Sequence, residues 1–169
     1  MRLWLPLILW AAALSSLEAQ DIVIVGGTPG GIASAVSAAR LGRSVTLVEY
    51  HPHIGGMTTS GLGKSDIENR AMIGGLFKEF VAAVHQHYVK TYGPGHENTK
   101  LSHGGYYAEP SVAEKVFEAM LAQHSKITVM KGWRLKSATV DRNKLTTITI
   151  LKLRVLELCE ASRFQGTSW

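Results

Sequence analysis

The sequence predicts an α/β fold with a mostly parallel sheet and a small added β-hairpin. Residues 21–25 (DIVIV) and 44–48 (SVTLV) are short apolar runs rich in β-branched residues, as strands buried on both faces are. Residues 32–41 lie between them with apolar side chains at helical spacing, and Gly42 supplies a stop signal. Strand, glycine turn, helix and strand together fit the length of one βαβ unit.

Two further helices are predicted downstream. Residues 75–92 carry one apolar stripe, and Gly93-Pro94 ends it. Residues 111–123 begin with an S-x-x-E pattern, which predicts a capping box between Ser111 and Glu114. We expect loops at residues 50–70 and 95–109.

The remaining strands complete the predicted fold. Residues 127–130 form a third parallel strand, and residues 135–140 and 145–150 pair as a hairpin across a turn at 141–144.

Charge is distributed unevenly along the 169 residues. Residues 1–125 hold nine Lys/Arg against ten Asp/Glu, whereas residues 126–169 hold nine against three. These late cations fall along predicted strands without an aromatic platform, so we interpret them as a solvated face and expect no nucleic-acid partner. The single cysteine, Cys159, excludes an internal disulfide, and we predict no metal site.

The N-terminus resembles an export signal. Arg2 precedes the apolar run of residues 3–14, which is shorter than the roughly 20 residues that span a bilayer. Small residues follow, and Ala19 offers a cleavage point. We therefore predict a signal peptide at residues 1–19, export to the periplasm or beyond by the general secretory route, and no stable membrane span after cleavage. An uncleaved anchor is the alternative.

A glycine-rich turn follows the first predicted strand. It consists of Gly26, Gly27, Thr28, Pro29, Gly30 and Gly31. Against the G-x-G-x-x-G pattern, Gly26 and Gly31 match and Thr28 replaces the second glycine, where its hydroxyl can itself bond phosphate. Such a turn directs the N–H groups of a helix N-terminus at a pyrophosphate.

Glu49 ends the second predicted strand, 18 positions past Gly31. A carboxylate at this place accepts hydrogen bonds from a ribose 2′-OH and repels a 2′-phosphate, which disfavours NADP. The two features together predict a dinucleotide site.

A second glycine signature selects FAD over NAD. Its residues are Gly55, Gly56, Met57, Thr58, Thr59, Ser60 and Gly61. This run resembles the second glycine signature of flavoproteins built like glutathione reductase and p-hydroxybenzoate hydroxylase.

Four segments carry a wider resemblance through residues 21–150. They are DIVIVGGTPGGIASAVSAARLGRSVTLVE, IGGMTTSGLGKSDI, IGGLFKEF and YYAEPSVAEKVFEAML. In combination they resemble the FAD-dependent oxidoreductase family, whose members are often secreted bacterial proteins. The resemblance implies a Rossmann-like unit in which the first turn and Glu49 hold the ADP half of FAD. The loop at residues 55–61 would approach the ribityl chain and flavin, and backbone at Leu135 would approach adenine.

The resemblance also implies a function. We expect an enzyme that transfers a hydride from an unknown small-molecule substrate to flavin, with an unknown electron acceptor and unassigned catalytic residues. Family members are longer, so we interpret residues 20–150 as the N-terminal part of an FAD-binding domain and residues 151–169 as an aberrant or truncated tail. The alternatives are a non-catalytic truncated dinucleotide-binding module and an NAD-dependent dehydrogenase.

Overall fold

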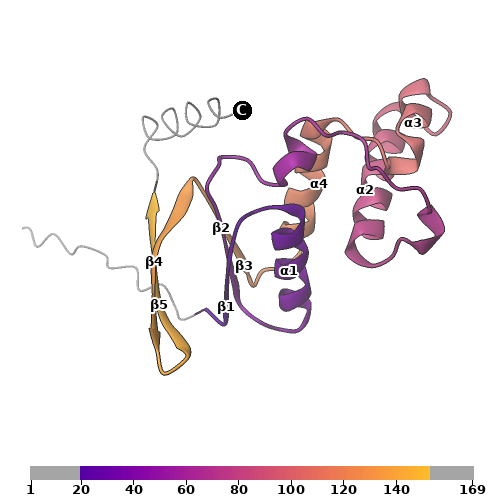
Figure 1. Cartoon of the computed structure of the whole chain (residues 1–169). Coiled ribbons are helices and arrows are strands. Elements are labelled where there is room, and N and C mark those ends of the chain that lie inside the picture. Colours follow the sequence, from indigo (N-terminus) through magenta and orange to yellow (C-terminus); the bar gives the residue numbers. More distant parts are fainter. Residues whose placement is uncertain (1–19, 153–169) are drawn as a thin grey trace, which may run out of the picture.

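The computed structural model describes residues 20–152, which form three layers (Figure 1). The central layer is a parallel sheet of β1 (Ile22–Val25), β2 (Val45–Glu49) and β3 (Ile127–Lys131), with β2 in the middle. The predicted parallel strands and their α/β fold class are therefore confirmed. The predictions on residues 1–19 and 153–169 lie outside the described residues.

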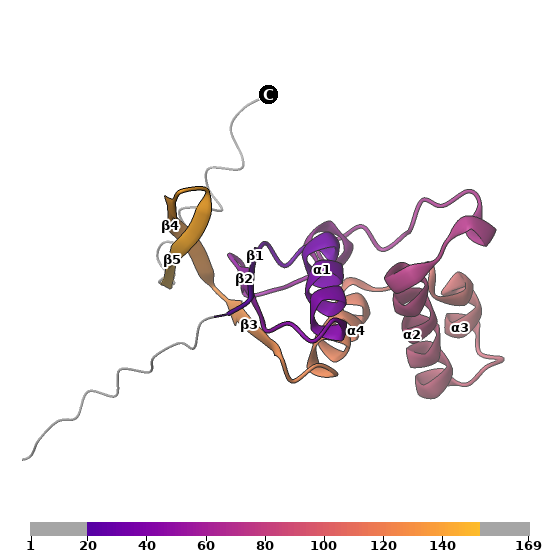
Figure 2. The same ribbon diagram turned by 90° about the horizontal axis from the view of Figure 1, so that it is seen from below.

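Helices cover one face of this sheet and extend beyond it (Figures 1 and 2). The α-helices are α1 (Pro29–Arg40), α2 (Gly75–Tyr92), α3 (Glu97–Leu101) and α4 (Pro110–Ala122). Three short 3-10 helices lie in the connections, η1 (Gly56–Thr59), η2 (Arg70–Met72) and η3 (His103–Gly105). No helix within residues 20–152 has both the length and the apolar character needed to cross a membrane.

The other face of the sheet is covered by the hairpin of β4 (Trp133–Asp141) and β5 (Lys144–Lys152). Both strands are longer than predicted. Arg142 and Asn143 in the turn have φ of 44° and 66°. Two successive positive φ values are typical of a type I′ turn, whose twist matches that of the paired strands.

The middle strand is buried on both faces, as predicted. Val45 and Leu47 belong to the core beneath the helices, whereas Thr46 and Val48 line a gap that faces β5. The same prediction for the first strand is wrong, because β1 forms an edge of the described sheet and leaves Val25 52% exposed.

Two helix starts differ from their predictions. Helix α1 begins at Pro29, three residues early, because the Thr28 hydroxyl accepts the Gly31 N–H (3.3 Å) and caps it. The Ser111–Glu114 capping box is wrong. Pro110 begins α4 one residue earlier, and Glu114 instead accepts the N–H of Ile54. The expected loop at 95–109 contains α3 and η3.

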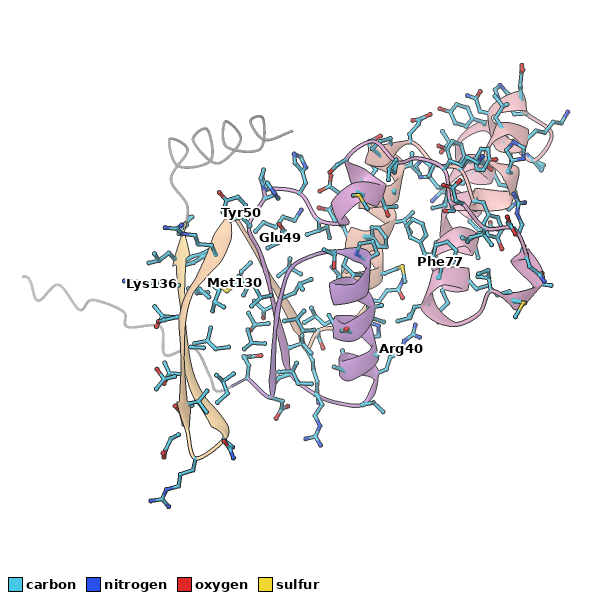
Figure 3. All side chains as sticks on the ribbon, viewed as in Figure 1. Arg40, Glu49, Tyr50, Phe77, Met130 and Lys136 are labelled. Atoms are coloured by element: carbon cyan, nitrogen blue, oxygen red, sulfur yellow. The ribbon has the colours of Figure 1, made fainter. Side chains whose placement is uncertain are left out.

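Helices α2 and α4 pack through aromatic side chains. The rings of Phe80 and Phe117 stack with centroids 4.3 Å apart. The Tyr88 hydroxyl accepts the N–H of Glu109 at 3.1 Å, just before α4 begins. Figure 3 shows Arg40 at the end of α1, where its guanidinium makes two hydrogen bonds with Glu79 of α2. These contacts fix the helical layer that supports the carboxyl end of the sheet.

Burial raises the pKa of the Tyr88 hydroxyl, although the Glu109 N–H opposes this shift. We expect Tyr88→Phe to cost about 1 kcal/mol at neutral pH, because the Glu109 N–H loses its acceptor. The unfolded tyrosine ionises near pH 10 and the folded one above it, so the wild-type stability falls as pH rises past 10. Urea unfolding from pH 7 to 11 should therefore show the two proteins converging. A difference that stays constant or widens contradicts this assignment.

Candidate dinucleotide-binding site

Two glycines shape the turn between β1 and α1 for different reasons. Gly26 has φ of +109°, and its N–H donates to the Val48 carbonyl at 2.8 Å. A Cβ at Gly31 would overlap the carbonyl oxygen of Gly26. Gly26 thus serves the backbone conformation, whereas Gly31 allows the helix to approach the turn closely.

The start of α1 leaves hydrogen-bond donors directed out of the turn. Thr28 holds the N–H groups of Gly31 and Ile32 through its hydroxyl and carbonyl oxygens. Pro29 has no N–H, so the remaining first-turn donor is that of Gly30, at the positive end of the helix dipole. The Thr28 hydroxyl hydrogen is not used in its capping bond and can still be donated to an anion. This arrangement fits a phosphate group.

Glu49 is buried at the carboxyl end of β2, with 8% of the residue exposed (Figure 3). One carboxylate oxygen accepts the Gly27 N–H at 2.5 Å, and the other accepts the His51 N–H at 2.8 Å. A carboxylate offers about four acceptor positions, so two remain for ribose hydroxyls. Glu49 therefore also ties the glycine turn to the loop after β2, a structural role that the sequence motif did not predict.

Position 27 favours glycine because the Glu49 side chain lies against it. A Cβ there would lie 3.0 Å from both a Glu49 carboxylate oxygen and the Ile54 side chain. The sequence spacing of Gly27 and Glu49 gave no sign of this contact, which depends on the pairing of β1 with β2.

The second glycine signature packs directly on the first turn. The Gly55 N–H donates to the Gly27 carbonyl at 2.6 Å. A Cβ at Gly56 would lie 3.6 Å from Pro29 Cδ and Thr28 Cγ2. The structure thus brings both glycine segments and Glu49 to one place.

The residues after Gly56 form η1 and line a neighbouring cavity. The Thr59 hydroxyl donates to the Ile54 carbonyl at 2.6 Å and so closes this turn. Met57 is 71% exposed, and Met57 and Thr58 both line the cavity. Ser60 ends η1, and Gly61 adopts φ of +132°.

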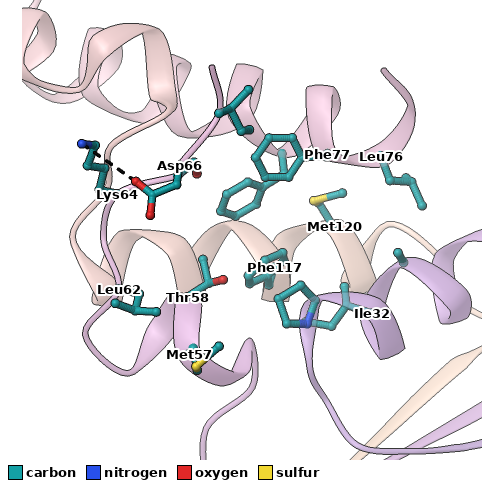
Figure 4. A pocket seen from close by; sticks show the side chains of 15 residues that line it. Ile32, Met57, Thr58, Leu62, Lys64, Asp66, Leu76, Phe77, Phe117 and Met120 are labelled. Atoms are coloured by element: carbon teal, nitrogen blue, oxygen red, sulfur yellow. Dashed lines mark ion pairs between the residues drawn. The ribbon is translucent and has the colours of Figure 1, made fainter. Parts of the chain in front are cut away.

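This cavity of about 410 Å³ lies between α1, the 57–67 segment, α2 and α4 (Figure 4). Its wall is mostly apolar, with Leu62, Phe77, Phe117 and Met120 among the lining residues, and an ion pair joins Lys64 and Asp66 at 3.9 Å. The apolar stripe of residues 75–92 indicated a helix with one buried face and gave no sign of this cavity. Their joint position follows from the packing of α2 on α4.

Leu135 lies apart from the two glycine segments. It pairs with Ile150 in the hairpin, and 43% of its surface is exposed. The backbone that reaches the loop after Glu49 is that of Gly132, whose N–H donates to the His51 carbonyl at 3.2 Å. The adenine contact of Leu135 stays a prediction. Within residues 20–152, no group of three His, Cys, Asp or Glu side chains is placed to hold a metal ion.

Gly31 and Gly30 offer a matched test of the turn, because neither has a positive φ. We expect Gly31→Ala to lose at least about 2 kcal/mol of stability, since its Cβ overlaps the Gly26 carbonyl. Gly30→Ala meets only the Thr28 hydroxyl at 3.9 Å and should be neutral or stabilising by up to about 1 kcal/mol. Denaturant unfolding measures both. Equal effects of the two substitutions contradict the close approach at Gly31.

Parts of this sequence are similar to those of known proteins. Dihydrolipoyl dehydrogenase, mitochondrial, of Dictyostelium discoideum is 34% identical over 80 residues, which are 46% of this chain and 16% of that protein. Leghemoglobin reductase of Glycine max is 38% identical over 47 residues, 28% of this chain and 9% of its own. The chain therefore spans less than a fifth of these relatives.

A solved structure matches over most of the fold. THI4 of Thermovibrio ammonificans superimposes with a TM-score of 0.51 at 18% identity, over 85% of this chain and 50% of that chain. The sequence pattern of the family described as FAD dependent oxidoreductase matches residues 21–164. This chain belongs to the FAD-dependent oxidoreductase family, and its cofactor is FAD.

Proposed function

We propose that residues 20–150 form the FAD-binding unit of an oxidoreductase in which a small-molecule substrate reduces the flavin. The main support for this proposal is one set of contacts. The buried Glu49 carboxylate, the turn at residues 26–31 and the glycine pair at 55–56 contact one another at the carboxyl end of β2. Ligands bind at this end of the strands in open α/β sheets.

The ADP half of FAD fits the first turn. The Gly30 N–H and the Thr28 hydroxyl would hold the pyrophosphate, where the α1 dipole favours negative charge. The two unused acceptor positions of Glu49 would accept the ribose hydroxyls. The contact between Leu135 and adenine stays a prediction. It is supported by the position of β4, which begins beside the loop that follows Glu49.

The flavin half of FAD fits the part of the site beside the second glycine segment. Residues 56–61 adjoin the apolar cavity and would position the ribityl chain and ring, with Met57 and Thr58 on the cavity wall. When bound, FAD would accept two electrons from the substrate, and an electron acceptor of unknown identity would take them from the reduced flavin. The chain's own contribution is to orient the cofactor and exclude water with side chains such as Phe77 and Phe117.

Titration of the purified chain with FAD tests this proposal. We expect one FAD per chain and a bound spectrum with absorbance at about 450 nm, a property of the cofactor itself. In the same assay, 5′-AMP should compete with FAD about tenfold better than 2′,5′-ADP, which differs from it only by the 2′-phosphate, because the Glu49 carboxylate repels that phosphate. Binding of NAD without FAD would favour the NAD-dependent dehydrogenase, and binding of neither would reject the site.

We also propose that the protein is exported. The support is the sequence of residues 1–19, a basic residue followed by an apolar run and small residues, which lies outside the described structure. Expression in a bacterial host should yield an envelope-fraction protein that begins at Gln20 or Asp21, as mass spectrometry can measure. Recovery of the cytosolic chain with its leader intact argues against export.

A further inference from the structure

We propose that Glu114 is a positioning residue for FAD, a role that rests on the proposed function. Glu114 lies on α4, outside both glycine segments. Its carboxylate holds the loop just before Gly55 and so keeps the second glycine segment packed on the first. It thereby sets the shape of the site without contacting the cofactor.

The contacts of Glu114 converge on the loop before Gly55. One carboxylate oxygen accepts the Ile54 N–H at 3.3 Å, and the other lies 3.1 Å from His53 Nδ1. Only 19% of the Glu114 side chain is exposed. A hydrogen bond between a carboxylate and a backbone N–H is stronger than a neutral one, so it restrains the backbone at Ile54 directly.

Ile54 and Gly55 connect this restraint to the phosphate-binding turn, because both contact Gly27. Ile54 is 1% exposed, and its Cγ2 lies 3.0 Å from the Cβ position of Gly27. The next residue, Gly55, donates its N–H to the Gly27 carbonyl. Phe117, almost one turn after Glu114, lies 2.9 Å from the Cβ position of Gly55. One face of α4 therefore supports the loop at two successive residues.

Glu118 provides a matched control on the same helix. Lys131 Nζ lies 3.7 Å from Glu114 and 2.5 Å from Glu118, so both carboxylates share one cation. Among the described hydrogen bonds, Glu118 accepts one from this lysine. Of the two carboxylates, only Glu114 accepts a hydrogen bond from the backbone of the loop. Loss of Glu118 removes the ion pair and leaves the Ile54 contact in place.

The test uses Glu114→Ala, Glu114→Gln and Glu118→Ala in the full chain. Two measurements apply to each: the FAD dissociation constant from flavin fluorescence, and residue-resolved amide exchange by NMR in the FAD-free protein. We expect Glu114→Ala to weaken FAD binding about tenfold and to speed exchange at Ile54 and Gly55 by a similar factor. Glu114→Gln keeps a carbonyl acceptor and should restore both values to within about threefold, and Glu118→Ala should stay within about twofold.

The proposal is overturned by any of three results. These are unchanged exchange at Ile54 and Gly55 in Glu114→Ala, equally fast exchange there in Glu118→Ala, and faster exchange in Glu114→Ala with unaltered FAD affinity. Exchange that stays at the wild-type rate in β2 of Glu114→Ala excludes general unfolding as the cause. Where the alanine variant does not fold, a Glu114→Gln variant outside the threefold limit overturns the proposal. Failure of the wild-type chain to bind FAD would reject the proposed function. The exchange measurements would still show separately whether Glu114 holds the loop.

Discussion

The hydrogen bonds from Gly27 and His51 to the buried carboxylate of Glu49 join the parts of the candidate site. Burial of a carboxylate is costly unless its oxygens receive hydrogen bonds, and here each oxygen accepts one backbone N–H. The glycine turn and the loop after β2 are therefore held to one strand end. Gly27 can approach the carboxylate because it has no side chain. A group usually regarded as a ribose ligand is also a structural link of the fold.

The remaining architecture keeps this link in place. Parallel pairing of β1 with β2 puts the first turn beside Glu49, and pairing with β3 brings Gly132 to the His51 carbonyl. Helix α4 then supports the loop from the outside. The second glycine segment is thus held between the first turn and α4, although its own residues form only a short 3-10 helix. Such support matters because binding energy is lost when a site must first be ordered.

Much of the fold follows from local sequence pattern. The apolar run at residues 45–48, the stripe of α2 and the turn between β4 and β5 each have a periodicity or turn signal that specifies one structure. The N-cap of α1 was missed, although Thr28-Pro29 combines a capping side chain with a proline at the first helical position. The capping box at Ser111 was misleading, because Pro110 moved the helix start and tertiary structure directed Glu114 elsewhere.

The site was predictable as a set of segments, and less so as a set of contacts. The motif spacing indicated Gly26, Gly31 and Glu49, but no local signal reports that Glu49 bonds Gly27. The cavity-lining role of Phe77 and Phe117 likewise depends on how two helices separated by a long connection pack together. The adenine contact of Leu135 rests on resemblance alone and stays a prediction, whereas the hydrogen bond from the Gly132 N–H to the loop after Glu49 is seen only in the structure.

We expect the ADP half of FAD to bind where the first turn, Glu49 and the second glycine segment meet. The most direct measurement is residue-resolved mapping of amide chemical shifts during titration with 5′-ADP. We expect the largest shifts at Gly27, Gly30 and the backbone of residues 49–56, with the β4–β5 turn unaffected. Shifts confined to the hairpin or to α2 and α3, with Gly27 and Gly30 unchanged, would contradict it.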